Sequence, residues 1–296
     1  MPAVTVLSHP LPISCGQTSW PARSCAWTST IASPSQAVQA CGTGVLVLAG
    51  SSGRVDIQRA RLLAEHGAVA LPLRWFGGKA LQPGPWEIPI ETFTQALDVL
   101  VPEVDRLAIM GVSFGAEAAL GTGSLDERVD TVIAFAPTSV VWAGYDEQEH
   151  RWTAHWTWRG QLLPYVPTEG ASSQADGSAS PSYLPVYRRS LRAASEVQLR
   201  QATIAVENVA DVLAVSGGDD QVWPSGEFAD AIAARRSYFG LETRHVALRE
   251  AGHRTILPGE EAPRDARKMA RGGSPAADVS LGELAWPHLH EVLGLT

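Results

Sequence analysis

The hydrophobic positions of this chain follow two alternating patterns from residue 42 onward. Short unbroken apolar runs, typical of strands buried on both faces, alternate with segments in which apolar residues recur every three or four positions, as on one face of a helix. The first pattern predicts strands over residues 44–50, 68–74, 106–111, 130–136, 211–218 and 243–250. The second predicts helices over residues 55–67, 88–101, 225–240 and about 278–294. This order predicts an α/β fold with a mostly parallel central sheet and helices on both of its faces.

The alternation stops between about residues 145 and 202. This segment has no comparable strand pattern but carries several tryptophans and tyrosines, and its stretch TEGASSQADGSASPS is poor in apolar residues. Interruptions of this length inside a domain usually serve a function. We therefore expect an aromatic-rich cap over the sheet, inserted at about residues 145–202. Residues 1–41 also lack a clear pattern, so we expect a weakly structured N-terminal segment followed by one domain, residues 42–296.

Composition argues against a nucleic-acid partner, a bound metal and a membrane-spanning segment. The formal net charge of −8 argues against a nucleic-acid partner. Cys15, Cys25 and Cys41 all precede residue 42, and none has a histidine at metal-ligand spacing, so we expect no metal. No apolar run approaches the roughly 20 residues of a membrane helix, and the N-terminus lacks a signal-peptide pattern. We expect a soluble, cytoplasmic protein without a cofactor or a membrane contact.

The stretch LAIMGVSFGAEAAL, residues 107–120, places a serine between a predicted strand and an alanine-rich helix. Gly111, Ser113 and Gly115 form a Gly-x-Ser-x-Gly pattern, which is weak alone but gains weight from the strand before it and the helix after it. Small residues at positions 111 and 115 let strand and helix approach in a sharp turn. The hydroxyl then lies at a helix N-terminus, where N–H groups favour negative charge. We predict that Ser113 is a nucleophile, and the alternative is a buried serine in a tight turn.

A nucleophilic serine needs a base, and the base needs an orienting acid. In hydrolases with this turn the order along the chain is serine, acid, histidine. The segment DVLAVSGGDDQVWP offers Asp219 and Asp220 after a predicted strand, and we favour Asp220 as the acid, with Asp219 as a turn residue. After the last predicted strand, EAGHR contains His253, which we predict as the base. The alternative for His253 is an ordinary surface-loop histidine.

Acyl transfer also needs two N–H donors for the oxyanion. One donor should be the amide of Phe114, which follows the nucleophile. The other should come from the loop after the first predicted strand, GSSGR, where we favour the amide of Ser51. Because no Gly-Lys-Ser/Thr follows these glycines, a Walker phosphate loop is excluded.

Five stretches of the chain resemble one known family, in the expected order. They are GVSFGAEAAL, FAPTSVVWAG, HWTWRGQLLPYVP, ATIAVENVADVLAVSGGDDQVWPS and EAGHRTILPGE. Over about residues 42–295 the chain is similar to the catalytic domain shared by acyl-CoA thioesterases and bile acid-CoA:amino acid N-acyltransferases, whose bacterial members are often labelled with dienelactone hydrolases. The resemblance implies an α/β-hydrolase fold and a Ser/Cys–Asp–His triad, whose roles fall here on Ser113, Asp220 and His253.

The chain departs from this family at two places. Typical relatives carry a lysine after the nucleophile, where this chain has Phe114, so a backbone donor is kept but a local charge is lost. Vertebrate members also carry an N-terminal β-sandwich, which the weakly patterned residues 1–41 cannot build.

The resemblance also bears on the reaction. The family's hydrolases resemble one another in using serine and its amino-acid-conjugating enzymes in using cysteine, so Ser113 favours water as the final acceptor. An acyl thioester, carried by coenzyme A or an acyl carrier protein, is the implied substrate, cleaved through an acyl-serine intermediate. A carboxylester or lactone hydrolase, an acyltransferase to an amine or alcohol, and a non-catalytic binding protein remain alternatives. Trp142 and Trp223 follow strand ends, where lining of a substrate pocket and plain packing are both open for them.

Overall fold

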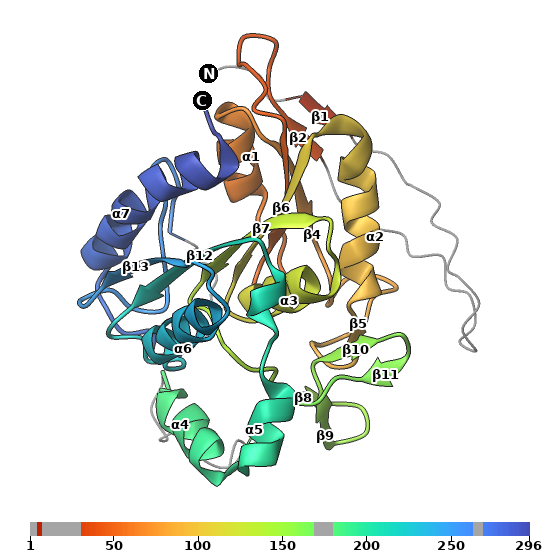
Figure 1. The fold of residues 1–296 in the computed structure, drawn as a ribbon, viewed down its shortest axis with the longest axis vertical. Coiled ribbons are helices and arrows are strands. Elements are labelled where there is room, and N and C mark those ends of the chain that lie inside the picture. The colour runs from red at the N-terminus through yellow and green to blue at the C-terminus, as the bar shows by residue number, and fades with distance from the viewer. Residues whose placement is uncertain (1–4, 8–30, 169–179, 263–268) are drawn as a thin grey trace.

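The centre of the molecule is an eight-stranded sheet in the order β1-β2-β4-β3-β6-β7-β12-β13 (Figure 1). The computed structural model describes residues 5–7, 31–168, 180–262 and 269–296. From β4 to β13 all neighbouring strands are parallel, whereas β2 is antiparallel to β1 and β4. The strands of this sheet are β1 (Thr5–Leu7), β2 (Ile31–Ser33), β3 (Thr43–Leu48), β4 (Val69–Leu73), β6 (Arg106–Val112), β7 (Val129–Phe135), β12 (Asp211–Gly217) and β13 (Arg244–Leu248). The predicted, mostly parallel sheet is confirmed.

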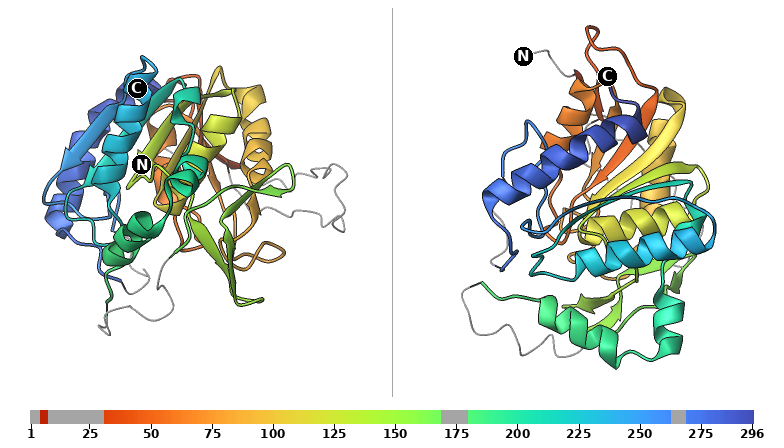
Figure 2. Two further views of the ribbon diagram at one scale, coloured as in Figure 1. Left: turned by 60° about the horizontal axis from the view of Figure 1, so that its bottom comes forward. Right: turned by 60° about the vertical axis from the view of Figure 1, so that its left-hand side comes forward.

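Helices cover both faces of this sheet (Figure 2). One face carries α1 (Ile57–Glu65) and α7 (Pro275–Leu293), and the other carries α2 (Glu91–Leu100), α3 (Phe114–Leu125) and α6 (Ser225–Tyr238). Successive side chains of a strand point to opposite faces. In β3, Leu46 therefore packs in the cluster of α2 and α3, while Val45 and Val47 pack in the cluster of α1 and α7. Burial on both faces accounts for the unbroken apolar runs in the sequence.

The chain between β7 and β12 builds the cap in short pieces. The cap and its partner strand comprise β5 (Ile88–Pro89), β8 (Ala143–Asp146), β9 (Arg151–Ala154), β10 (Trp156–Trp158), β11 (Gln161–Leu162), α4 (Leu184–Ala193) and α5 (Glu196–Ala202). Strand β8 pairs with β9, and β10 pairs with both β5 and β11. Two 3₁₀ turns complete the described elements, η1 (Val101–Glu103) and η2 (Val206–Asn208). In Figure 1 the cap lies beneath the sheet, beyond α3 and α6.

The N-terminal part of the chain supplies strands at one edge of the sheet. Residues Thr5–Leu7 pair with Ile31–Ser33, and Ala32 of β2 is the register partner of Ala70 of β4. Two of the three cysteines discussed above lie outside the described residues, and the third, Cys41, is a free thiol. Within the described residues no group of three or more histidine, cysteine, aspartate or glutamate side chains is placed to hold a metal, and none of the helices is long and apolar enough to span a membrane.

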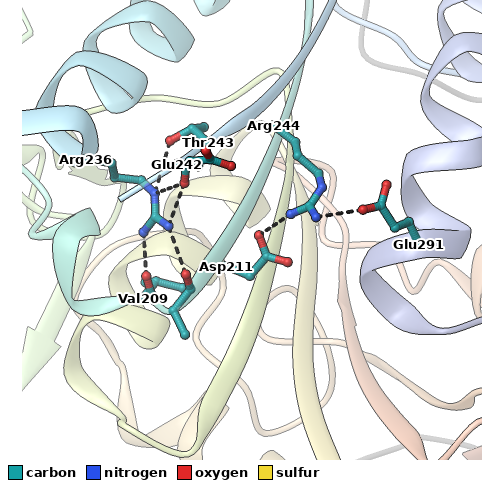
Figure 3. Close-up of polar contacts among 8 residues, drawn as sticks. Val209, Asp211, Arg236, Glu242, Thr243, Arg244 and Glu291 are labelled. Atoms are coloured by element: carbon teal, nitrogen blue, oxygen red, sulfur yellow. Dashed lines mark hydrogen bonds and ion pairs between the residues drawn. The ribbon is translucent and has the colours of Figure 1, made fainter. Parts of the chain in front are cut away.

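Two arginines hold the opposite edge of the sheet (Figure 3). Arg236, buried near the end of α6, donates hydrogen bonds to the carbonyl oxygens of Val206, Val209, Ala210 and Glu242. Arg244 of β13 bridges Asp211 of β12 and Glu291 of α7, with a nitrogen–oxygen distance of 2.8 Å to each. Arg244 thereby joins β13, whose following loop carries His253, to β12 and to α7.

Candidate active site

Ser113 stands at a strained turn between β6 and α3. Its backbone has φ 59° and ψ −124°, in the left-handed half of conformational space that a non-glycine residue adopts only under constraint. The constraint is steric. A Cβ on Gly111 would lie 2.0 Å from the carbonyl oxygen of Gly115, and a Cβ on Gly115 would lie 2.5 Å from that of Leu48. The two glycines therefore allow the close approach of strand and helix that the sequence pattern predicts.

Asp220 follows β12 and is almost fully buried. Its Oδ1 accepts the backbone N–H groups of Val222 at 2.8 Å and Trp223 at 3.2 Å. Its Oδ2 accepts the hydroxyl of Ser225 at 2.6 Å and lies 2.8 Å from Nδ1 of His253. The carboxylate thus uses one oxygen to fix its own loop and the other to orient the imidazole.

Asp219, the other aspartate of this loop, has different partners. Its Oδ2 accepts the backbone N–H of Gly273 at 2.7 Å, and its Oδ1 accepts the side-chain amide of Gln221 at 2.8 Å. Asp219 is therefore a turn residue of the loop, and Asp220 is the carboxylate that contacts the histidine.

His253 follows β13 and is held by its backbone as well as its ring. Its N–H donates to the carbonyl oxygen of Arg271 at 2.8 Å, and its imidazole is nine-tenths buried, with 8% of its surface exposed. Because Nδ1 donates to the Asp220 carboxylate, the neutral ring carries its lone pair on Nε2. This is the tautomer that a general base toward a serine hydroxyl requires.

The two halves of the candidate site meet at Trp223. The Trp223 ring lies 5.6 Å from the ring of Phe114, which follows Ser113, and 5.8 Å from the imidazole of His253. The three strands that lead to Ser113, Asp220 and His253 all belong to the parallel half of the sheet, so their carboxyl ends share one edge. The hydroxyl of Ser113 makes no hydrogen bond to another described residue. The structure thus shows the acid–histidine pair, and the serine–histidine contact stays a prediction.

A second serine–histidine–aspartate set occurs nearby and has a different character. Nε2 of His245 lies 2.8 Å from Oγ of Ser216, and its Nδ1 lies 3.5 Å from Oδ1 of Asp230. Ser216 sits within β12 rather than at a helix N-terminus, and only 1% of its surface is exposed. A substrate carbonyl cannot reach a hydroxyl inside a strand, so this set serves the packing of β12 on β13.

The two segments that carry the predicted oxyanion donors adjoin Ser113. A Cβ on Gly50 would lie 3.1 Å from Cβ and 3.7 Å from Oγ of Ser113, so the loop after β3 lies against Ser113. Ser51 is the next residue of that loop. The amide of Phe114 is the first N–H of α3 and belongs to the group that has no partner within a helix.

The two predicted pocket tryptophans are both fully buried. Trp142 donates its indole N–H to Oγ1 of Thr138 at 3.0 Å, and Trp223 donates its own to the carbonyl oxygen of Ala136 at 3.1 Å. Tyr187 of α4 packs between them, with ring-centre distances of 4.6 Å to Trp142 and 5.5 Å to Trp223. The Trp223 ring thus packs against the imidazole of His253. Its contribution to a substrate pocket, and that of Trp142, stays a prediction.

One polar residue beside the nucleophile escaped the sequence analysis. Glu117 lies one turn after Ser113 on α3 and is fully buried. Its Oε1 lies 2.9 Å from the backbone nitrogen of Trp142, 2.8 Å from the indole nitrogen of Trp156 and 3.2 Å from Nδ1 of His155. The available signal was a single charged residue in the small, apolar helix FGAEAALGTG.

Comparison with solved structures agrees with this architecture. The chain resembles the esterase Est2 of the Planctomycetes species Thermogutta terrifontis (TM-score 0.53, 13% identity, 99% of this chain and 95% of that chain). It also resembles a Klebsiella pneumoniae protein named as a dienelactone hydrolase (0.52, 12%, 94% and 97%) and a puromycin-hydrolysing peptidase of Mycobacterium tuberculosis (0.54, 16%, 99% and 40%). At these identities the likeness establishes the fold alone, which is that of the α/β hydrolases.

A search of curated proteins finds no match to the chain. The family model described as "BAAT / Acyl-CoA thioester hydrolase C terminal" matches residues 88–291, a range that includes α3, the cap and the loops of Asp220 and His253. The chain therefore belongs to the family of the C-terminal domain of acyl-CoA thioester hydrolases and bile acid-CoA:amino acid N-acyltransferases, within the α/β hydrolases.

Proposed function

We propose that this protein is a serine hydrolase that cleaves an acyl thioester through an acyl-serine intermediate. The observation that carries the proposal is the buried Asp220–His253 pair, 2.8 Å apart, at the sheet edge where β6 presents Ser113 in a strained turn. Family membership supports hydrolase chemistry at this edge.

In the proposed reaction, Oγ of Ser113 attacks the acyl carbonyl carbon while Nε2 of His253 takes the hydroxyl proton. The amides of Phe114 and Ser51 stabilise the negative charge that develops on the carbonyl oxygen. Collapse of the tetrahedral intermediate breaks the carbon–sulfur bond, and the imidazolium returns its proton to the leaving thiolate. A water molecule, deprotonated by His253, then attacks the acyl-serine, and the second collapse releases the carboxylic acid and restores Ser113.

The lack of a hydrogen bond from Ser113 Oγ to another described residue is compatible with this cycle. Hydrogen bonds of catalytic residues are often long before substrate binds and tighten in the complex. The ring of Trp223 packs against both Phe114 and His253, so the segments that carry the hydroxyl and the imidazole adjoin one side chain.

The substrate class is the finer part of the proposal. A thioester carried by coenzyme A or by an acyl carrier protein is favoured by family membership, and a serine nucleophile favours water over an amine as the final acceptor. We also propose that the protein acts in the cytoplasm as a soluble enzyme. Oxygen-ester hydrolysis and acyl transfer use the same three residues, so kinetics must separate these reactions.

Mass spectrometry of the intact protein after incubation with a panel of acyl thioesters tests the proposal. We expect a mass increase equal to the acyl group, mapped to Ser113 and absent in Ser113→Ala. Paired assays on an acyl-CoA and on its oxygen ester then measure the preference, and added amines or alcohols reveal any acyl transfer. Absence of an adduct, together with failure of wild-type protein to label with a serine-directed fluorophosphonate, would overturn the enzymatic proposal.

A further inference from the structure

Glu117 links the nucleophile helix to the cap through a single carboxyl oxygen. Its Oε1 receives donors from Trp142, just before β8, and from the adjoining His155 and Trp156, which connect β9 and β10. These two segments are themselves joined, because His155 donates its backbone N–H to the carbonyl oxygen of Trp142 at 3.3 Å. These cap segments therefore meet at Glu117, one helical turn beyond Ser113.

The imidazole that Glu117 holds packs against the residue that supplies the proposed oxyanion donor. The ring centres of His155 and Phe114 are 4.2 Å apart, with the planes at 62°. On its other side Phe114 meets Trp223, which contacts His253. Phe114 is thus held between an imidazole anchored by Glu117 and a tryptophan that supports the proposed base.

The use of a carboxyl group for this link lowers the stability of the fold. Its second oxygen, Oε2, is buried and has no hydrogen-bond partner among the described residues. A buried polar atom without a partner lowers stability, and natural proteins keep such features mainly at functional sites. Satisfying the two N–H donors of Trp142 and Trp156 does not by itself require a second, unpaired oxygen.

We propose that Glu117 and His155 act together as positioning residues that set Phe114, and with it the amide that stabilises the oxyanion. This inference rests on the proposed function, because the amide of Phe114 matters only if Ser113 is acylated. Neither Glu117 nor His155 takes part in proton transfer in the proposal. The His155 ring supports Phe114, and the Glu117 carboxyl fixes that ring through Nδ1.

A double-mutant cycle tests the proposal, with the acylation rate expressed per competent site. Fluorophosphonate labelling counts the competent sites, so a variant that merely folds less well does not register as slower. We expect His155→Ala and Glu117→Leu each to lower kcat per labelled site about 10- to 100-fold with KM changed less than about 3-fold, as for loss of an interaction made in the transition state. The double variant should be no slower than the slower single variant, because both changes remove the same support. Glu117→Gln keeps an acceptor oxygen and should recover most of the rate.

Arg236→Lys is the matched control, because Arg236 is also a buried, hydrogen-bonded charged residue but lies at the far end of α6. The Arg236→Lys variant should have a lower free energy of unfolding and an unchanged kcat per labelled site. Should Glu117→Leu fail to fold, His155→Ala alone decides, since the proposal requires its rate to fall. An unchanged rate per labelled site in His155→Ala, or losses that multiply in the double variant, would overturn the proposal. A wild-type protein that does not label at Ser113 would instead overturn the proposed function itself.

Discussion

Replacement of Asp220 by asparagine changes one atom of the candidate triad and leaves its shape intact. The asparagine carbonyl oxygen can still accept the N–H groups of Val222 and Trp223, which now bind Oδ1 at 2.8 and 3.2 Å. The new NH₂ group takes the place of Oδ2, which now faces Oγ of Ser225 at 2.6 Å and Nδ1 of His253 at 2.8 Å. The Ser225 hydroxyl can rotate to accept a hydrogen bond, but the imidazole can accept one only by moving its proton to Nε2.

That proton shift determines how far the acylation rate falls. With Nε2 protonated, His253 cannot take the proton of Ser113, so acylation proceeds only through the minor tautomer. Loss of the correct tautomer in a serine–histidine–aspartate triad lowers kcat by about 10⁴-fold, which corresponds to about 5.5 kcal/mol of activation free energy. Stability should fall far less, by about 1–3 kcal/mol, because the two backbone hydrogen bonds on Oδ1 are kept.

The assay is the single-turnover acylation rate of Ser113 with a chromogenic ester or thioester, alongside urea unfolding of each variant. Asp219→Asn is the matched control, because Asp219 is the neighbouring aspartate and among the described residues it accepts its hydrogen bonds from Gly273 and Gln221, not from the imidazole. It should acylate at the wild-type rate. A rate within about 10-fold of wild type for Asp220→Asn, or a large loss confined to Asp219→Asn, would show that the Asp220–His253 contact does not work as a catalytic pair.

Four further predictions concern the frame around this pair. Gly115→Ala would place a Cβ 2.5 Å from the carbonyl oxygen of Leu48, so unfolding midpoints in urea should show a loss of about 3 kcal/mol or more, and wild-type stability would contradict the tight turn. Ser225→Ala removes the 2.6 Å hydrogen bond to Asp220 and should lower the acylation rate about 10-fold with KM unchanged. Arg236→Lys should cost about 2 kcal/mol in urea unfolding, since several carbonyl oxygens lose donors, while kcat per labelled site stays constant. Burial lowers the pKa of His245 below its ordinary value of 6.5, against an opposing effect of Asp230. The unfolded chain therefore binds this proton first, so stability falls as pH drops below about 6.5, and His245→Gln should flatten that part of the stability–pH curve.

The sheet and the three candidate triad positions were open to prediction because their signals are local. Ser113 and Asp220 follow apolar runs that become buried strands, and His253 follows the shorter apolar run 246–248 of β13; parallel strands place their carboxyl ends together. Nothing local separates Asp219 from Asp220, since both follow the same glycines. The structure separates them because the Asp220 side chain turns back to the N–H groups of its own loop, whereas Asp219 reaches across to Gly273.

The cap could not be predicted beyond its existence, for a physical reason. Its strands β8 to β11 are two to four residues long, too short to show a periodic pattern. One of them, β10, pairs with β5, which lies far earlier in the chain. The role of Glu117 was hidden for the same reason, because its partners Trp142, His155 and Trp156 carry no signal that relates them to α3.

The site divides into two parts that are held by different elements. Ser113 precedes α3 and Glu117 lies in its first turn, and α3 packs against the mostly buried central strands β6 and β7. The loop of His253 instead follows the edge strand β13, whose residues are mostly half-buried and which Arg244 joins to α7 through Glu291. The loop itself is buried at Ala251, Gly252 and His253, and His253 donates its backbone N–H to the carbonyl oxygen of Arg271. The loop of His253 is therefore held by hydrogen bonds to segments outside the edge strand, at Asp219, Arg271 and Asp278, whereas Ser113 is fixed by the packing of β6 and α3.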